Sequence, residues 1–67
     1  MYYKEKMPVL SFRFIKNNEP MWFEAYQVGE QYALTWRDVE DRGGWIAWRN
    51  NLDEVLKLIP LDAEKVV

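Results

Sequence analysis

The sequence predicts an α+β domain: a four-stranded antiparallel β-meander followed by one C-terminal helix packed on one face, in the order β-β-β-β-α. Three observations indicate this fold. Apolar and aromatic residues alternate with polar ones over four separate segments, as in half-buried strands. Short segments with turn chemistry separate these four segments. From residue 52 onward the apolar spacing changes from that of a strand to that of a helix.

The four expected strands are rich in aromatic and β-branched residues, which favour extended backbone. Leu10, Phe12 and Phe14 occupy every second position of the first segment. The expected strands span residues 9–16, 21–28, 31–39 and 44–49.

The first connection sets the expected pairing of the first two strands. Residues 17–20, NNEP, suit a four-residue loop, which pairs Lys16 with Met21. Phe14 then lies opposite Phe23, and every other pair of the hairpin follows from this register.

The other two connections carry glycine. Gly29-Glu30 suits a two-residue type II′ turn, which pairs Val28 with Gln31, because its first central residue needs a positive φ. Residues 41–44, DRGG, are the third turn signal. They admit a loop of two, three or four residues, so the register of the last strand stays open.

The segment after the strands predicts a short helix. Asn51 is suited to cap its N-terminus, and Pro60 disfavours helix at the residue before it. A helix this short is unstable alone, so its apolar stripe must lie on the sheet. Residues 61–67 are expected to be a frayed tail or one extra turn. The stripe, spaced i, i+3, i+4 and i+7, is formed by Leu52, Val55, Leu56 and Ile59.

These registers divide the side chains of the sheet between two faces. In the fourth strand, Ile46 and Trp48 are expected on the helix side and Trp45 on the other, and a slip of one residue exchanges them. The face assigned to the helix carries Leu10, Phe12, Phe14, Met21, Phe23, Ala25, Leu34 and Trp36.

Length and composition bound the organisation of the chain. Its 67 residues suffice for one domain, expected to be ordered over about residues 8–60, with flexible ends at residues 1–7 and 61–67. There is no cysteine for a disulfide and no histidine for a metal, so neither a metal nor a cofactor is expected. A domain of this size has a marginal core, which a second copy of the chain could support.

Charge and hydropathy narrow the classes of partner. The net charge of −2 comes from acidic and basic residues mixed along the chain, without the basic stripe that binds duplex DNA or an anionic membrane. No apolar stretch is long enough to span a bilayer, and the N-terminus lacks the apolar region of a signal peptide. We therefore expect a cytoplasmic protein that does not bind membranes.

The residues needed for catalysis are scarce. Histidine and cysteine are absent, and Ser11 and Thr35 are the sole serine and threonine. The acidic residues Asp38, Glu40 and Asp41 cluster near a turn, where carboxylates are common, and their spacing fits no calcium loop. The sequence therefore predicts that the protein is not an enzyme.

The second face of the sheet is the candidate functional site. A solvent-facing sheet surface is ordinarily polar, whereas this one carries Trp, Tyr and Arg, which are enriched at binding hot spots. A protein partner or a second copy is the expected occupant, with single-stranded nucleic acid as the alternative. A carbohydrate or small apolar ligand stacked on a tryptophan is a third class. The candidate binding residues are Arg13, Ile15, Trp22, Tyr26, Arg37 and Trp45.

A purely structural role for this face is the competing interpretation. The expected cross-strand pairs Arg13–Glu24 and Trp22–Arg37 could simply stabilise a two-sided sheet. Alternatively, the ends of the chain cover the face, through the C-terminal tail or through Tyr2 and Tyr3.

Two resemblances concern the end of the chain. NLDEVLKLI, residues 51–59, resembles the opening of the helix in HicB-like antitoxins. Four strands followed by a helix also resembles the order of elements in a small single-strand DNA-binding fold. Neither resemblance assigns a functional residue, because a fold alone does not fix a function.

Overall fold

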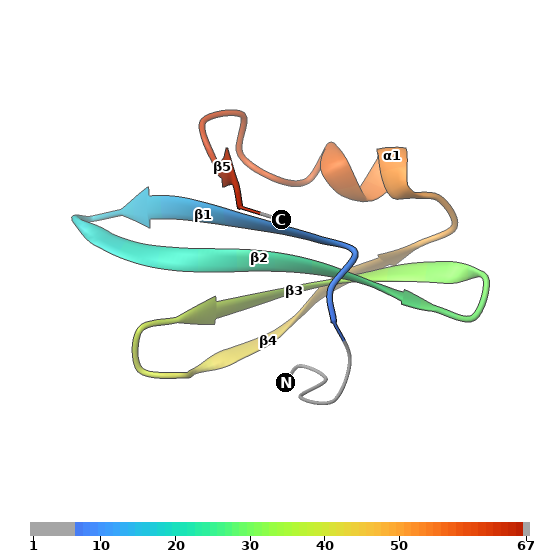
Figure 1. Cartoon of the computed structure of the whole chain (residues 1–67), viewed down its shortest axis with the longest axis horizontal. Helices are drawn as coiled ribbons and strands as arrows, with labels where there is room; N and C mark the ends of the chain where they lie inside the picture. Colours follow the sequence, from blue (N-terminus) through green and yellow to red (C-terminus); the bar gives the residue numbers. More distant parts are fainter. Residues whose placement is uncertain (1–6, 67) are drawn as a thin grey trace.

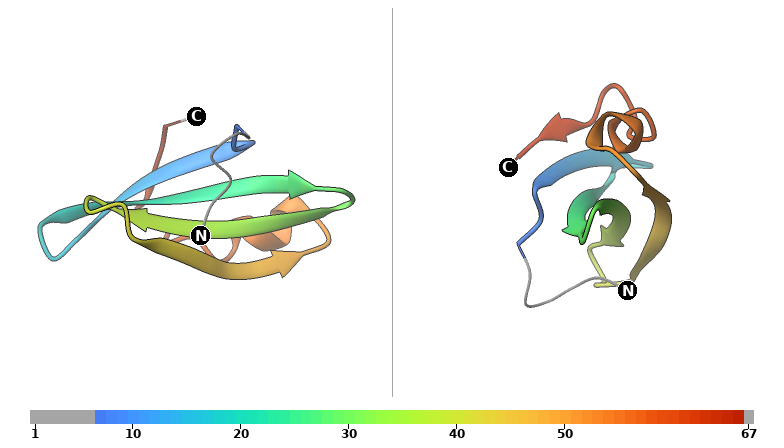
Figure 2. Two further views of the ribbon diagram at one scale, coloured as in Figure 1. Left: turned by 90° about the horizontal axis from the view of Figure 1, so that it is seen from below. Right: turned by 90° about the vertical axis from the view of Figure 1, so that its right-hand side faces the viewer.

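The computed structural model describes residues 7–66. Five strands form a single sheet, and one short helix lies on one of its faces (Figures 1 and 2). The sheet is antiparallel throughout, with strand order β4-β3-β2-β1-β5. The predicted antiparallel meander and C-terminal helix are present, and β5 is an addition. The elements are β1 (Leu10–Lys16), β2 (Glu19–Val28), β3 (Gln31–Asp38), β4 (Gly43–Arg49), α1 (Leu52–Leu56) and β5 (Glu64–Lys65).

The first hairpin is tighter than predicted. Lys16 pairs with Glu19, so the connection has two residues rather than four, and the expected pairing with Met21 is wrong. Asn17 and Asn18 both take left-handed backbone, with φ of 54° and 67°. Positive φ at both central residues is the type I′ turn, and asparagine adopts it at lower cost than most residues.

The shorter turn shifts the register of β1 by two residues, so each side chain keeps its predicted face. Phe12 now lies opposite Phe23. Arg13 lies opposite Trp22, so the predicted Arg13–Glu24 pair is wrong.

The second hairpin follows the prediction. Val28 pairs with Gln31, and Gly29 has a φ of 63° at the first central position of the turn. Trp22 consequently lies opposite Arg37, as the sequence predicted.

The connection between β3 and β4 does not use the glycines as its turn residues. β3 ends at Asp38 and β4 begins at Gly43. The left-handed residue of this turn is Asp41, with φ of 62°, while Gly43 is already paired with Arg37.

β4 carries a β-bulge, which decides the faces of its side chains. Ala47 lies opposite Leu34 and Trp45 lies opposite Thr35, so Ile46 is the extra residue. A bulge of one residue reverses the alternation beyond it. Trp48 therefore shares the face of Trp45, and its predicted place on the helix side is wrong.

The core lies between the sheet and the segment that contains α1. Every residue of the first three strands that the sequence assigned to the helix side is buried in this core or packs against it. Tyr32 and Ala63 join them. The buried residues of the cluster are Phe23, Ala25, Leu34, Val55 and Ile59.

α1 begins as predicted but ends early. The Asn51 side-chain oxygen accepts the backbone N–H of Glu54 at 3.0 Å, which caps the first turn. The helix ends at Leu56, and Ile59 N–H donates to the carbonyl of Leu56, three residues back. This tighter turn still buries Ile59, which is 7% exposed.

The C-terminal segment extends the sheet, where a frayed tail or an extra turn was expected. β5 pairs with β1, placing Lys65 opposite Phe12 and Glu64 opposite Arg13. Val66 N–H donates to the carbonyl of Ser11 at 2.8 Å. These described residues of the tail therefore continue the sheet at its edge instead of folding over its second face.

Candidate functional site

The six predicted binding residues share one face of the sheet, but their exposure differs widely. Ile15 is 52% exposed and Trp45 is 41% exposed. Tyr26 is buried, at 2% exposed, which contradicts its expected place on an open surface. The six residues therefore share one face, as predicted, but the centre of that face is not open to solvent.

A buried polar cluster occupies the centre of this face. The Tyr26 hydroxyl donates to a Glu24 carboxylate oxygen at 3.3 Å. The Thr35 hydroxyl donates to the Glu24 carbonyl at 3.3 Å. Tyr2 and Tyr3, the expected cover of this face, lie outside the described residues.

Trp22 and Arg37 form the cross-strand pair that the sequence predicted. The Arg37 guanidinium carbon lies 4.9 Å from the centre of a Trp22 ring, a cation–π contact. An Arg37 nitrogen also lies 3.6 Å from a Glu24 carboxylate oxygen. Arg37 is therefore held between an aromatic face and a mostly buried carboxylate, which supports a structural role.

Arg13 is tied to the edge of the sheet. Its guanidinium lies 3.5 Å from the Glu64 carboxylate, and both side chains are largely exposed. An exposed pair of this kind contributes roughly 0–1 kcal/mol. Its position indicates that Arg13 helps to fasten β5 to β1.

Trp45 and Trp48 form an exposed aromatic pair on β4. Their ring centres lie 5.2 Å apart, with an angle of 31° between the ring planes. Each residue is 41% exposed. Sequence reasoning missed Trp48, because a spacing of three residues puts two side chains on one face only where a bulge lies between them.

The strand that carries this pair is an edge of the sheet. No other strand of residues 7–66 pairs with the outer side of β4. β4 contains neither proline nor lysine, the residues that most often protect edge strands, although it has a bulge at Ile46 and one charged residue, Arg49, at its end. An edge of this kind can accept a further strand.

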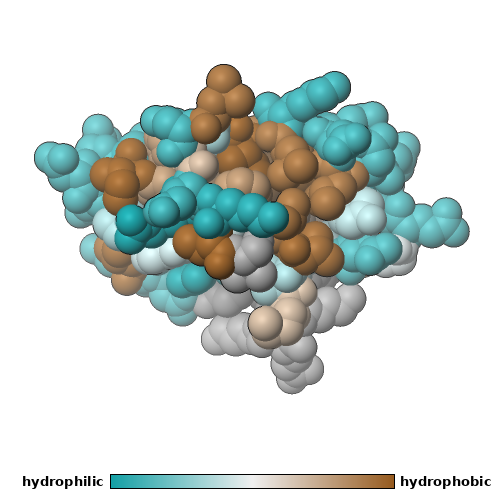
Figure 3. Space-filling model, turned by 45° about the horizontal axis from the view of Figure 1, so that its top comes forward, coloured by the Kyte–Doolittle hydropathy of each residue, from teal (hydrophilic) through white to brown (hydrophobic). Residues whose placement is uncertain are grey.

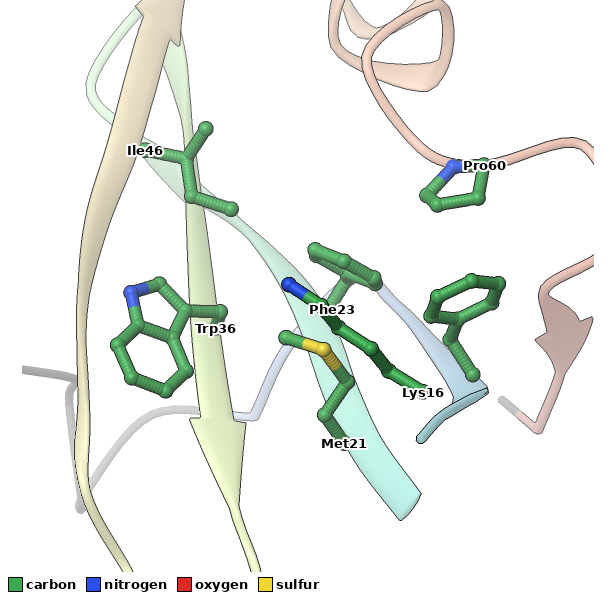
Figure 4. A pocket seen from close by; sticks show the side chains of 7 residues that line it. Lys16, Met21, Phe23, Trp36, Ile46 and Pro60 are labelled. Atoms are coloured by element: carbon green, nitrogen blue, oxygen red, sulfur yellow. The ribbon is translucent and has the colours of Figure 1, made fainter. Parts of the chain in front are cut away.

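The opposite face of the sheet, which the sequence assigned to packing against the helix, holds an open groove. Its volume is about 560 Å³. The helix side, which carries this groove, shows hydrophobic residues gathered between hydrophilic ones (Figure 3). The groove, shown in Figure 4, is lined by Phe14, Lys16, Met21, Phe23, Trp36, Ile46 and Pro60.

The acidic turn between β3 and β4 has a structural explanation. One Asp38 carboxylate oxygen accepts the backbone N–H groups of Glu40 and Arg42, at 3.0 and 2.9 Å. The other accepts from the Arg42 guanidinium at 2.9 Å. Desolvation raises the pKa of Asp38, but these hydrogen bonds outweigh it and hold the pKa below its ordinary value of 3.8. Asp38 therefore organises this turn.

Replacing Arg42 by glutamine should raise the pKa of Asp38 toward its ordinary value. The backbone hydrogen bonds remain in this variant, so the pKa should recover only in part. In the parent protein, a lowered folded-state pKa means that the carboxylate stabilises the turn above the unfolded pKa. This stabilisation is lost as the pH falls through the folded pKa. Carboxyl NMR titration of both proteins measures the difference, and an unchanged Asp38 midpoint would show that the guanidinium has no role.

Metal-binding groups, membrane-spanning helices and similarity to known proteins were each considered. Within the described part, no group of three or more His, Cys, Asp and Glu is placed to hold a metal ion. No described helix has the length and apolar character needed to cross a membrane. Comparison of the chain with protein-family models, with curated proteins and with solved structures gave no match.

Proposed function

We propose that this chain is a non-enzymatic, cytoplasmic interaction module that associates with a second copy of itself through β4. The observation that carries this proposal is the Trp45–Trp48 pair, whose two residues are each 41% exposed on β4, an edge strand of the described sheet. Tryptophan is among the residues most enriched at the energetic centres of interfaces.

The edge of β4 suits a symmetric contact. Two identical antiparallel edge strands can pair about a two-fold axis, so that the same residues face each other in both directions. Such pairing would satisfy the outward backbone groups of β4 and continue the sheet across both copies. It would also bring both tryptophan pairs together on the same face.

The size of the interface is within reach for a domain this small. A specific interface needs roughly 1,000 Å² in total, about 500 Å² from each copy. This is about a tenth of the 4768 Å² accessible surface of the chain. The apolar side chains of β4 can supply part of it, because Trp45 and Trp48 are each 41% exposed and a large aromatic side chain offers on the order of 150–250 Å² when fully open.

Single-stranded nucleic acid, the alternative occupant, has less support. Stacking platforms need exposed rings and available cations. Tyr26 is buried, and Arg37 is held by Trp22 and Glu24. The carboxylate of Glu24 also places negative charge near the middle of this face.

The absence of histidine and cysteine from the chain supports the non-enzymatic part of the proposal.

Light scattering over a series from low micromolar to millimolar protein tests the proposal with two matched variants. Trp48→Lys places a charge beside the edge, and Ile15→Lys places the same charge on the same face, at β1. We expect the parent to dimerise and Trp48→Lys to weaken the dimer by roughly tenfold or more. Ile15→Lys should leave the dimer unchanged.

Two outcomes would contradict this proposal. A parent protein that stays monomeric at every concentration would rule out self-association. Equal weakening by both variants would place the contact on the whole sheet face and not on the β4 edge. Circular dichroism of each variant checks that both remain folded.

A further inference from the structure

The groove on the helix side exists because α1 covers only part of its sheet face. The helix ends at Leu56, and the chain then turns at Pro60 toward β5 (Figures 1 and 4). An opening of about 560 Å³ is left over one end of the sheet. The C-terminal halves of β1 and β3 meet the N-terminal halves of β2 and β4 beneath it. Ligand-binding sites in proteins span about 300–1,000 Å³, so this opening has the size of a small-molecule site.

The lining of the groove is apolar and well supported. Phe23 is only 9% exposed and belongs to the buried core, which fixes the floor. Phe14 packs beside it, with the two ring centres 6.3 Å apart. Met21 adds a flexible thioether that can adjust to the shape of a ligand. The groove therefore offers a firm aromatic floor with one adaptable wall.

A single charged residue, Lys16, lines this apolar groove. Its side chain runs alongside Met21 and Phe23 toward the middle of the opening (Figure 4). None of the ion pairs formed by residues 7–66 involves Lys16. Its ammonium group is therefore placed to meet the charge of a ligand whose body lies in the groove.

A smaller hollow of about 200 Å³ continues from Lys16, Met21 and Trp36 toward Glu19 and Asp38. Asp38 is already engaged by Arg42 at 2.9 Å. The carboxylates of Glu19 and Asp38 would repel a second negative charge on a ligand that reached past Lys16 into this hollow. The charge pattern therefore favours a compact ligand with one anionic group, whose apolar body extends away from the hollow toward Pro60.

We propose that this groove binds a small amphipathic monoanion, namely an aliphatic or aromatic carboxylate. The carboxylate lies at the Lys16 ammonium, and the apolar body lies among Phe14, Phe23, Trp36 and Ile46. This site lies on the other face of the sheet from the tryptophan pair, so it does not rest on the proposed self-association.

The test is an NMR titration with three ligands that share one tail: decanoate, decanol and decyltrimethylammonium, all below their micelle-forming concentrations. The reporters are the Met21 methyl group, the Ile46 methyl groups and the Trp36 indole N–H. We expect saturable shifts at these reporters with decanoate, weaker binding of decanol and the weakest binding of the cation. Equal affinity for all three ligands, or shifts centred on Trp45 and Trp48, would overturn the proposal.

A matched pair of variants assigns the charge preference. Lys16→Gln should weaken decanoate binding roughly three- to fivefold, the range of a partly exposed ion pair, and leave decanol binding unchanged. Lys57→Gln removes the same charge from an exposed residue after α1 that does not line the groove, and it should change neither affinity. If Lys16→Gln leaves decanoate binding unchanged, the Lys16 part of the proposal is wrong.

Discussion

Replacing Leu34 by alanine should lower the free energy of unfolding by about 2–5 kcal/mol. Leu34 is fully buried, at 0% exposed, in the middle of β3. Its neighbours across the two adjacent strands are Ala25 and Ala47, which are too small to fill the space that it leaves. The variant therefore loses the transfer free energy of the deleted methyl and methylene groups, and it also loses the packing contacts of the residues that line the cavity left behind.

Urea unfolding followed by circular dichroism measures this loss. A domain of 67 residues is stable by about 3–10 kcal/mol, so Leu34→Ala removes a large part of the total. Leu61→Ala is the control, because the same change at a fully exposed residue should cost less than about 0.5 kcal/mol. Should Leu34→Ala fail to fold, Leu34→Val gives a smaller, measurable loss. Equal losses of unfolding free energy at positions 34 and 61 would contradict the placement of Leu34 in the core.

Replacing Gly43 by alanine should destabilise the domain by about 1–3 kcal/mol. A Cβ atom at this position would collide with the backbone carbonyl oxygen of Trp36 on the neighbouring strand. A backbone atom inside a sheet cannot move aside as a flexible side chain can. β3 and β4 must therefore separate locally, which weakens the pairing of Gly43 with Arg37.

Amide hydrogen exchange distinguishes this effect from an ordinary glycine substitution. Gly43→Ala should speed exchange along β3 and β4. Gly29→Ala meets no atom within 4 Å, so its cost of roughly 1–2 kcal/mol comes from the positive φ at that turn. Its exchange should quicken at the β2–β3 turn and not along β4. Unchanged exchange in β3 and β4 of the Gly43→Ala variant would show that the sheet tolerates the added Cβ.

The faces of the sheet could be predicted from the sequence because they depend only on alternation. The first hairpin has a register two residues away from the expected one, yet Phe12 and Phe14 keep their side of the sheet. A shift by an even number of residues preserves faces, so the helix-side core survived this error. The turn itself was misjudged because Pro20, which suggested a loop residue, lies within β2.

The features that the sequence did not predict depend on backbone irregularities and on distant contacts. The bulge at Ile46 moves Trp48 to the second face, and no residue in this strand signals it in advance. β5 has two residues and is held by β1, far away in the sequence, so no local pattern announces it. Such pairing depends on the assembled sheet.

The candidate sites depend on exposure, which a single sequence does not encode. Tyr26 is of a residue type that is common at binding hot spots, but it is buried. Trp36 was expected in the core, but it is half-buried and lines the groove. The early end of α1 at Leu56 leaves that groove open. A helix continuing to Ile59, as predicted, covers more of the same face.

In the proposed dimer, the outer edge of β4 pairs with β4 of a second copy. Amide hydrogen exchange, measured residue by residue at low and at high protein concentration, tests it most directly. Edge pairing predicts that slow exchange appears at the outward-facing amides of β4 only at high concentration, while amides of β2 stay unchanged. If the protein dimerises and exchange in β4 is nevertheless independent of concentration, the contact lies elsewhere and the proposed pairing of β4 is wrong.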